Sequence, residues 1–311
     1  MPELSEVSEV CDVVAAVDIG GTRIKAALVT AAYETPAAVT TPTPKDIATD
    51  VGAVVHATVT DLLATAANDG HPARLVGCGV VVPGLVDELR GVGLYSVNLG
   101  WRDLPIRDSV ASLLGVPTAV GHDVRAGLLA ETRLGAARGA RHALFLPVGT
   151  GIAGALLLDG AVIAADGRAG ELGHLVIDPS GPACRCGATG CLEVIASAAA
   201  IEREFAARTG QAAPAEEIAV RASAGDPDAS AVWARATAAL AQAIVATVTI
   251  TGVDLVLIGG GLAESGAALL DPLRVDVARR LTFQRPPRLE RAAFGARAGC
   301  LGAACLAWDA L

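Results

Sequence analysis

The sequence predicts an α/β protein built from two similar lobes. A strand-like run, a Gly/Thr turn and a second strand-like run occur twice, with the turns at Asp18–Thr22 and Gly149–Gly151. Helical and strand patterns alternate over much of the remaining chain. The 311 residues are enough for two domains of ordinary size. We expect the lobes to join near residue 120 and to enclose a cleft, because no low-complexity linker separates them.

The first lobe is predicted from residues 1–120. Val13–Ile19 and Lys25–Thr30 are apolar runs that indicate a hairpin with its turn at Gly20-Gly21. Hydrophobic spacing or apolar runs predict further elements, namely a helix over Pro44–Asn68, a buried strand over Arg74–Val82, a helix over Pro105–Leu114 and a strand over Val116–Val120.

The second lobe is predicted from residues 121–297, with the final helix, about residues 298–311, packing back on the first lobe. The elements expected here are a helix over Asp123–Leu134, strands over His142–Val148 and Ile152–Leu158, helices over Val194–Arg208 and Asp228–Ile250, a strand over Val253–Ile258 and an amphipathic helix over Gly299–Leu311.

Charge and hydropathy exclude some classes of function. The net charge is −9 and the sequence shows no Lys/Arg cluster, so we expect no nucleic-acid partner. The mean hydropathy is +0.51, but the most apolar stretch, Ala243–Ala263, is interrupted by threonines, Asp254 and glycines. It therefore favours a helix followed by a buried strand over a membrane span. Met1–Cys11 is acidic and unlike a secretory signal, which favours the cytoplasm.

A cysteine-rich segment carries the strongest chemical signal. Cys184, Cys186 and Cys191 fall within eight residues, and His174 precedes them by ten positions. One imidazole and three thiolates form a complete ligand set for a closed, structural zinc site. Buried structural cysteines are the alternative. Glu171 and Glu193 bracket the cluster, so they are either ligand-binding carboxylates held in place by the metal or solvated surface groups.

Three glycine turns are candidates for binding phosphate or nucleotide. Successive N–H groups at Gly20, Gly21 and Thr22 could form an anion-binding concavity, and Asp18 at the strand end could hold Mg²⁺. A plain hairpin turn is the alternative for this segment taken alone, and no Walker A motif is present. Gly149, Thr150 and Gly151 repeat the same chemistry, and Gly259, Gly260 and Gly261 suit a base or ribose, or simply a tight turn.

Asp123 is the candidate general base. It follows a strand at the expected junction of the lobes, where an ionised carboxylate could take a proton from a hydroxyl nucleophile. The competing interpretation is an ordinary helix cap.

Taken together, the motifs resemble the ROK family (repressor, open reading frame, kinase) over nearly the whole chain. They are found in Asp18–Thr22, Pro83–Asp87, Asn98–Trp101, Gly149–Ile152, Gly170–His174, Cys184–Gly187 and Gly190–Glu193. The resemblance implies a two-lobed actin-like ATPase fold, a homodimer, and ATP-dependent phosphorylation of the 6-hydroxyl of a hexose, most of all glucose.

The resemblance also implies roles for individual residues. Asp123 corresponds to the base. ATP binding falls to Asp18, Gly20, Gly21, Thr22, Arg23, Lys25, Gly149, Thr150, Gly151, Gly259, Gly260 and Gly261. Sugar binding falls to Gly84, Asn98, His122, Glu171, His174 and Glu193, with His174 serving both zinc and substrate.

One segment departs from the family pattern. The family usually has Asn-Asp-Ala-Asn where this chain has His122, Asp123, Val124 and Arg125. A neutral imidazole can replace an amide because it offers one donor and one acceptor, but it can also select another group, such as an amine. An amino-sugar kinase, for an N-acetylhexosamine or a 3-amino sugar, is therefore the alternative enzyme. A sugar-responsive repressor or sensor is a different class, disfavoured by the short segment before Asp18 and by the presence of Asp123.

Overall fold

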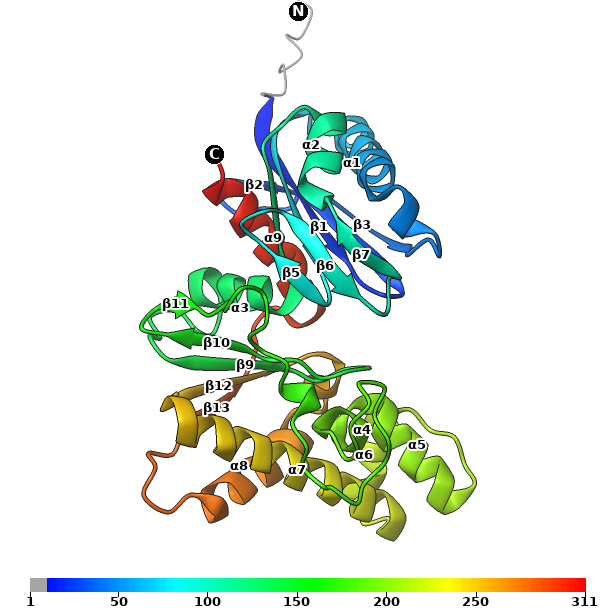
Figure 1. Cartoon of the computed structure of the whole chain (residues 1–311), viewed down its shortest axis with the longest axis vertical. Helices are drawn as coiled ribbons and strands as arrows, with labels where there is room; N and C mark the ends of the chain where they lie inside the picture. Colours follow the sequence, from blue (N-terminus) through cyan, green and yellow to red (C-terminus); the bar gives the residue numbers. More distant parts are fainter. Residues whose placement is uncertain (1–9) are drawn as a thin grey trace, which may run out of the picture. The chain divides into compact units, whose positions relative to one another are not determined.

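The computed structural model describes residues 10–311; most of the acidic N-terminal segment lies outside the described residues. The chain divides into two compact units. Unit 1 holds the described residues up to Ala130, together with Ala165–Arg168 and Arg297–Leu311. Unit 2 holds Glu131–Ala164 and Ala169–Ala296. Figure 1 shows the elements of both units.

Unit 1 is built on a five-stranded sheet in the order β3-β2-β1-β4-β8. Its strands are β1 (Cys11–Ile19), β2 (Arg23–Thr30), β3 (Ala37–Pro42), β4 (Ala73–Val82) and β8 (Thr118–His122). β1, β2 and β3 are antiparallel, and β4 and β8 run parallel to β1. The predicted hairpin is confirmed, and its register pairs Asp18 with Lys25.

Both faces of this sheet are covered, which explains the uninterrupted apolar sequence of β1. Val13, Ala15, Val17 and Ile19 pack with α1 (Val51–Asn68) and α2 (Ile106–Leu114). Val14 and Ala16 instead pack with α9 (Ala298–Asp309) on the other face. A strand buried on both faces has no polar alternation to show.

The last helix, α9, is not amphipathic, so the prediction for Gly299–Leu311 was wrong in that respect. Most of its residues are buried: Ala298, Cys300, Gly302, Ala303, Ala304, Cys305 and Ala307. It lies so close to the sheet that a Cβ on Gly79 of β4 would be 1.9 Å from the carbonyl oxygen of Ala303. Small residues on both elements allow this approach.

A second, three-stranded antiparallel sheet in unit 1 was not anticipated. It contains β5 (Leu85–Asp87), β6 (Val92–Ser96) and β7 (Trp101–Leu104). The helix predicted over Pro44–Asn68 begins later, at Val51, because Asp50 caps it by accepting a hydrogen bond from Ala53 N at 2.8 Å. A short 3₁₀ turn, η1 (Ile47–Thr49), precedes this cap.

Unit 2 has its own five-stranded sheet in the order β11-β10-β9-β12-β13. The strands are β9 (Ala143–Pro147), β10 (Ala155–Leu158), β11 (Ala161–Val162), β12 (Leu255–Gly259) and β13 (Arg288–Arg291). β9 and β10 form the second predicted strand–turn–strand unit, and β12 and β13 run parallel to β9.

Helices pack against this sheet around the long helix α7. The helices of unit 2 are α4 (Leu192–Ala196), α5 (Ala198–Thr209), α6 (Ala215–Ser223), α7 (Pro227–Thr251) and α8 (Ala267–Arg280), with 3₁₀ turns η2 (Leu172–His174), η3 (Gly261–Ser265) and η4 (Gly295–Arg297). α3 (Asp123–Leu134) begins in unit 1 and ends in unit 2. Among residues 10–311, α7 is the one helix long and apolar enough to cross a membrane, but 61% of its most apolar window is buried inside the protein. The prediction of a helix followed by a buried strand is confirmed, since β12 follows α7 directly.

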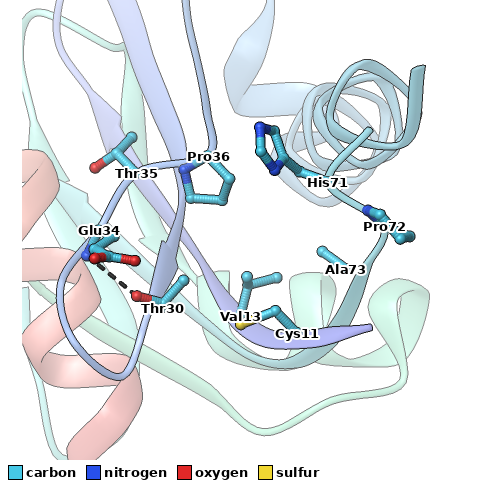
Figure 2. A pocket seen from close by; sticks show the side chains of 9 residues that line it. All are labelled: Cys11, Val13, Thr30, Glu34, Thr35, Pro36, His71, Pro72 and Ala73. Carbon is cyan, nitrogen blue, oxygen red and sulfur yellow. Dashed lines mark hydrogen bonds between the residues drawn. The ribbon is translucent and has the colours of Figure 1, made fainter. Parts of the chain in front are cut away.

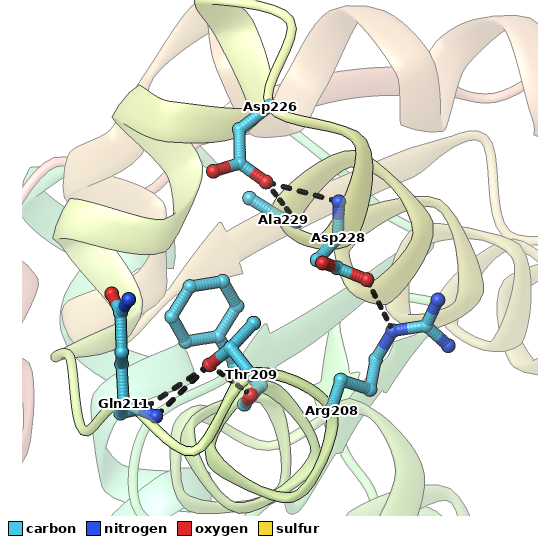
Figure 3. A network of polar contacts seen from close by, with 7 residues as sticks. Arg208, Thr209, Gln211, Asp226, Asp228 and Ala229 are labelled. Carbon is cyan, nitrogen blue, oxygen red and sulfur yellow. Dashed lines mark hydrogen bonds and ion pairs between the residues drawn. The ribbon is translucent and has the colours of Figure 1, made fainter.

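The single helix predicted over Val194–Arg208 is in fact two helices. Ser197 lies between them and caps α5 by accepting a hydrogen bond from Ala200 N at 3.2 Å. A polar contact links the C-terminal end of α5 to the start of α7 (Figure 3). Asp226 Oδ1 caps α7 by accepting from Asp228 N and Ala229 N, each at 2.9 Å, while Arg208 Nε lies 3.3 Å from Asp228 Oδ1.

The division between the units falls after Ala130 rather than near residue 120. The first turns of α3 stay with unit 1 because a Cβ on Gly302 of α9 would be only 2.0 Å from the carbonyl oxygen of Ala126. Residues 165–168 also belong to unit 1, and a Cβ on Gly167 would meet the carbonyl oxygen of Val86 at 2.1 Å.

Candidate active site

Asp18 lies at the end of β1 beside Lys25, its partner across the hairpin. Lys25 Nζ is 3.6 Å from Asp18 Oδ2. Burial raises the pKa of Asp18 to about 6, and the negative charge of Asp123 adds to this shift while Lys25 opposes it. α9 approaches Asp18 through Gly299, where a Cβ would be 2.7 Å from Oδ2. The site thus contains a buried carboxylate that is costly to ionise without a cation nearby.

Two hydrogen bonds fix the backbone of the Gly20-Gly21 turn, and the residues that follow Gly20 are exposed to solvent. Gly20 N donates to the carbonyl oxygen of Arg23 at 2.9 Å, and Thr43 Oγ1 donates to the carbonyl oxygen of Gly20 at 2.7 Å. Gly21, Thr22 and Arg23 are exposed. This leaves a fixed glycine turn that a charged ligand can approach closely.

Two more predicted residues lie on the loops of the small sheet. Asn98, after β6, is exposed and adjacent to the turn, since a Cβ on Gly21 would be 3.4 Å from its Cβ. Gly84 has a φ of +102°, and a Cβ there would be 2.3 Å from the carbonyl oxygen of Tyr95. Glycine is therefore required at position 84 for the backbone, whether or not a ligand contacts it.

Asp123 is the first residue of α3, immediately after β8. Its Oδ1 accepts a hydrogen bond from Val124 N at 2.8 Å, and its side chain is 28% exposed. Burial raises the pKa of Asp123, against the opposing effects of the Val124 N–H and the charges of Arg125 and Lys25. A partly exposed carboxylate with a raised pKa suits a general base.

Glu88 is a site residue that the sequence did not single out. Its Oε1 accepts a hydrogen bond from His122 N at 3.2 Å and pairs with Arg125 Nε at 2.8 Å. Glu88 therefore contacts the residue before Asp123 and the residue two positions after it. The signal that could have found this pair is Arg125 itself, because its side chain is only 3% exposed and a buried charge needs an acidic partner.

In unit 2, hydrogen bonds to the backbone of Val148 link two of the predicted glycine turns. Val148 N donates to the carbonyl oxygen of Gly259 at 2.9 Å, and Leu262 N donates to the carbonyl oxygen of Val148 at 3.0 Å. Gly260 has a φ of +75°, and a Cβ there would be 2.3 Å from the carbonyl oxygen of Val148. The segments 149–151 and 259–261 thus form one glycine-rich edge of the sheet.

The Gly149–Gly151 turn is also tied to the helix that follows the cysteine cluster. Glu193 Oε2 accepts a hydrogen bond from Ile152 N at 3.0 Å, and a Cβ on Gly151 would be 2.6 Å from the same oxygen. Ala198 N donates to the carbonyl oxygen of Gly149 at 2.8 Å. One oxygen of Glu193 therefore holds the turn in place.

The cysteine cluster has the geometry of a metal site. The ligand atoms of His174, Cys184, Cys186 and Cys191 all lie within 4.8 Å of one another. The Sγ atoms of Cys186 and Cys191 are 3.6 Å apart, and Cys184 Sγ is 3.7 Å from His174 Nδ1. A tetrahedral zinc ion with Zn–S bonds of about 2.3 Å places sulfur atoms roughly 3.8 Å apart, so the four side chains fit this ion.

The two nitrogens of His174 face different groups. Nδ1 faces the cysteine thiols, and Nε2 lies 3.9 Å from Glu171 Oε2. A histidine that binds metal through Nδ1 presents its Nε2–H to a carboxylate or a ligand, which fixes the ring. Both Glu171 and His174 are exposed, so the pair is accessible from solvent.

The pocket shown in Figure 2 is separate from these residues. It has a volume of about 270 Å³ and is lined by Cys11, Val13, Thr30, Glu34, Thr35, Pro36, His71, Pro72 and Ala73. It lies at the start of β1, whereas Asp18 lies at the end, so the strand separates them by roughly 20 Å. None of the predicted site residues lines it.

Two α/β units, each with a glycine turn between its first two strands, define the two-lobed actin-like ATPase class of fold. The profile of the ROK family matches residues 14–310, and the chain belongs to this family.

Similar proteins include the glucokinase of Halalkalibacterium halodurans, 33% identical over 276 residues that cover 83% of each chain. Among solved structures, the ROK hexokinase from Thermus thermophilus is 34% identical with a TM-score of 0.81, covering 96% of this chain and 98% of that one. A ROK family glucokinase from Streptomyces griseus, in complex with glucose and AMPPNP, is 27% identical with a TM-score of 0.80, covering 96% and 99%.

Relatives named for a different sugar substrate are also similar to this chain over nearly its whole length. The N-acetylmannosamine kinase of Pasteurella multocida is 29% identical over 300 residues, covering 95% of this chain and 96% of that one. Overall similarity therefore does not by itself distinguish a hexose from an amino sugar as the substrate.

Proposed function

We propose that the protein is an ATP-dependent sugar kinase that phosphorylates the 6-hydroxyl of a hexose, with glucose as its preferred substrate. Its enzyme class is that of the hexokinase and glucokinase type of phosphotransferase, to which its relatives at 33–35% identity belong. The related glucokinase bound to glucose and AMPPNP supports ATP as the donor. The observation that carries the proposal is Asp123, a partly exposed carboxylate with a raised pKa at the start of α3.

In the proposed reaction, Asp123 takes the proton of the sugar 6-hydroxyl as the oxygen attacks the γ-phosphorus. The O–P bond to the sugar forms, the bond from the γ-phosphorus to ADP breaks, and the proton stays on Asp123. Phosphoryl transfer depends on positioning and on neutralising charge, so one base and several charge-stabilising groups suffice. Asp18 is the carboxylate that would hold Mg²⁺, which neutralises charge on the transferred phosphate.

Phosphate binding is assigned to the exposed glycine turns. Gly20, Gly21 and Thr22 supply N–H and hydroxyl donors, Arg23 and Lys25 supply positive charge, and Gly149, Thr150 and Gly151 repeat the arrangement in unit 2. We assign the adenosine to Gly259, Gly260 and Gly261, which share an edge with the second turn. Glycines suit both roles because the backbone can approach the ligand closely.

Sugar binding is assigned to Glu171, His174 and Glu193, with Asn98, Gly84 and His122 from unit 1. A structural zinc ion would fix the segment that contains Glu171, His174 and Glu193. Its ligands would be His174, Cys184, Cys186 and Cys191. The four-ligand fit described above supports this role, since a site closed by four protein ligands is structural. We also infer from family membership that the protein is a cytoplasmic homodimer.

An amino-sugar kinase is the second candidate, and His122 is the observation that favours it. An imidazole stands beside the base where the family usually has an amide. The relative that phosphorylates N-acetylmannosamine is nearly as similar in sequence as the glucokinases. An amine on the substrate would suit an imidazole acceptor.

ADP production with Mg-ATP separates the two candidates. The sugars to compare are glucose, mannose, N-acetylglucosamine, N-acetylmannosamine, glucosamine and 3-amino-3-deoxyglucose, with Asp123→Ala as the control. A preference for glucose supports the main proposal. A preference for an amino sugar replaces it, and ADP production that does not depend on any sugar contradicts both.

A further inference from the structure

The imidazole of His122 lies against the carboxylate of Asp123. His122 Nδ1 is 3.2 Å from Asp123 Oδ1. The backbone N–H of Val124 lies between them, with its nitrogen 3.1 Å from Nδ1 and 2.8 Å from Oδ1. The His122 side chain is 8% exposed, whereas that of Asp123 is 28% exposed. The Nδ1 edge of the ring is therefore turned toward the base, and the carboxylate is the more accessible group of the two.

The protonation of Nδ1 follows from this geometry. If Nδ1 carried a lone pair, two acceptors 3.2 Å apart would share the single N–H of Val124. If Nδ1 carries the proton, it donates to Oδ1, and Oδ1 accepts from Val124 N as well, because a carboxylate oxygen has two lone pairs. An ionised carboxylate favours the second arrangement, since a hydrogen bond to a charged acceptor is the stronger one.

We propose that His122 is a positioning residue for the base: its Nδ1–H donates to Oδ1 of Asp123 and leaves Oδ2 to receive the proton of the sugar hydroxyl. The inference rests on the proposed role of Asp123. In the reaction the sugar O–H bond breaks and the O–P bond forms. The proton ends on Oδ2, while His122 keeps its own proton throughout.

Glu88 and Arg125 hold the backbone on both sides of this pair. Glu88 Oε1 binds His122 N and Arg125 Nε, and the Arg125 side chain is only 3% exposed. The two departures from the family pattern thus act together, because His122 contacts the base and Arg125 secures the acid that fixes the turn. The charged groups that face the pair come from four places: Asp18 on β1, Lys25 on β2, Glu88 after β5 and Arg125 on α3.

The pH dependence of turnover tests the proposal with two variants. His122→Leu removes the donor, and His122→Asn keeps an N–H donor that does not titrate. We expect His122→Leu to lower kcat by about 10- to 100-fold, the scale of a misplaced catalytic group, in addition to any change in the KM for the sugar. His122→Asn should restore most of kcat, which a purely steric role of the ring would not require.

The acid limb of the kcat profile should also move in His122→Asn. An imidazole can gain a positive charge, and such a charge beside Asp123 keeps the carboxylate ionised to lower pH. A neutral amide lacks this charge, so the limb should shift to higher pH. The shift is compared between the two proteins and is not assigned to one residue.

The outcomes separate this inference from the function it rests on. If Asp123→Asn retains activity, Asp123 is not the base, and the inference about His122 is wrong as well. An inactive Asp123→Asn, combined with a His122→Leu variant of normal kcat and raised sugar KM, would overturn the inference alone, because His122 would then act on the sugar and not on the base. If His122→Leu does not fold, as judged by thermal unfolding, an unshifted acid limb in His122→Asn overturns it.

Discussion

Replacing Cys191 by serine tests the proposed metal site and predicts a measurable loss of stability. Cys191 is fully buried and lies 17 residues after His174. Between them, beyond η2, the segment contains only isolated bridges at Val176↔Cys191 and Ala183↔Thr189. Backbone hydrogen bonds, such as that from Ile177 N to the carbonyl oxygen of Gly190 at 2.8 Å, also cross the segment, and the metal would add a cross-link between its side chains.

The magnitude follows from the length of the loop. Closing a loop of this length stabilises a fold by about 3 kcal/mol in the chain-entropy estimate. For a unit of 150–250 residues, one kcal/mol corresponds to about 2–4 °C in Tm. We therefore expect Cys191→Ser, or removal of zinc by a chelator, to lower Tm by about 6–12 °C.

The assay combines zinc content by mass spectrometry with thermal unfolding in the presence and absence of chelator. Cys11→Ser is the matched control, because Cys11 is exposed and lies outside the cluster. It should keep both zinc and Tm unchanged. Purified wild-type protein that contains no zinc and unfolds at the same temperature with chelator would refute the reasoning.

Three further predictions concern the base, the buried carboxylate and the packing of α9. Asp123→Ala should lower turnover by about 100- to 10,000-fold without changing the melting curve, and normal turnover would end its assignment as the base. The folded pKa of Asp18, about 6, lies above its usual 3.8. The folded state therefore binds the proton more tightly, and stability falls as pH rises from about 4 to 6, with a full cost of up to about 3 kcal/mol above that range. Asp18→Asn should remove this cost, so its Tm relative to wild type should rise between pH 4 and pH 6 and then level off; a constant difference would contradict it. Gly79→Ala should destabilise unit 1 by about 1–3 kcal/mol in denaturant unfolding, because its Cβ would collide with the carbonyl oxygen of Ala303. An unchanged midpoint would mean that α9 can move away at no cost.

Long elements with a clear period could be predicted from the sequence. The β1–β2 and β9–β10 hairpins and the helices α3 and α7 lie where the apolar runs and periodicity place them. These elements bury many residues each, so the pattern of a whole segment outweighs any single residue. The cysteine cluster could also be found, because its ligands are close in sequence as well as in space.

Elements that depend on single residues or on distant partners could not be predicted. The break between α4 and α5 depends on the one side chain of Ser197, and β5, β6 and β7 are too short to show a period. The position of α9 could be predicted but its burial could not, because distant strands cover the face that was expected to be polar. Likewise, Glu88 lies 34 residues from His122 along the chain, and only the fold brings them together.

The return of α9 to the first sheet has a consequence for the order in which the protein folds during synthesis. β1, β4 and β8 are all complete by His122, but α9, the helix that covers most of their second face, begins only at Ala298. The apolar face formed by Val14, Ala16 and Val81 must therefore stay largely uncovered while all of unit 2 leaves the ribosome. Unit 2 is nearly continuous in sequence and can complete its core first, although it is made second. On the ribosome, the N-terminal sheet is thus the aggregation-prone part of the nascent chain.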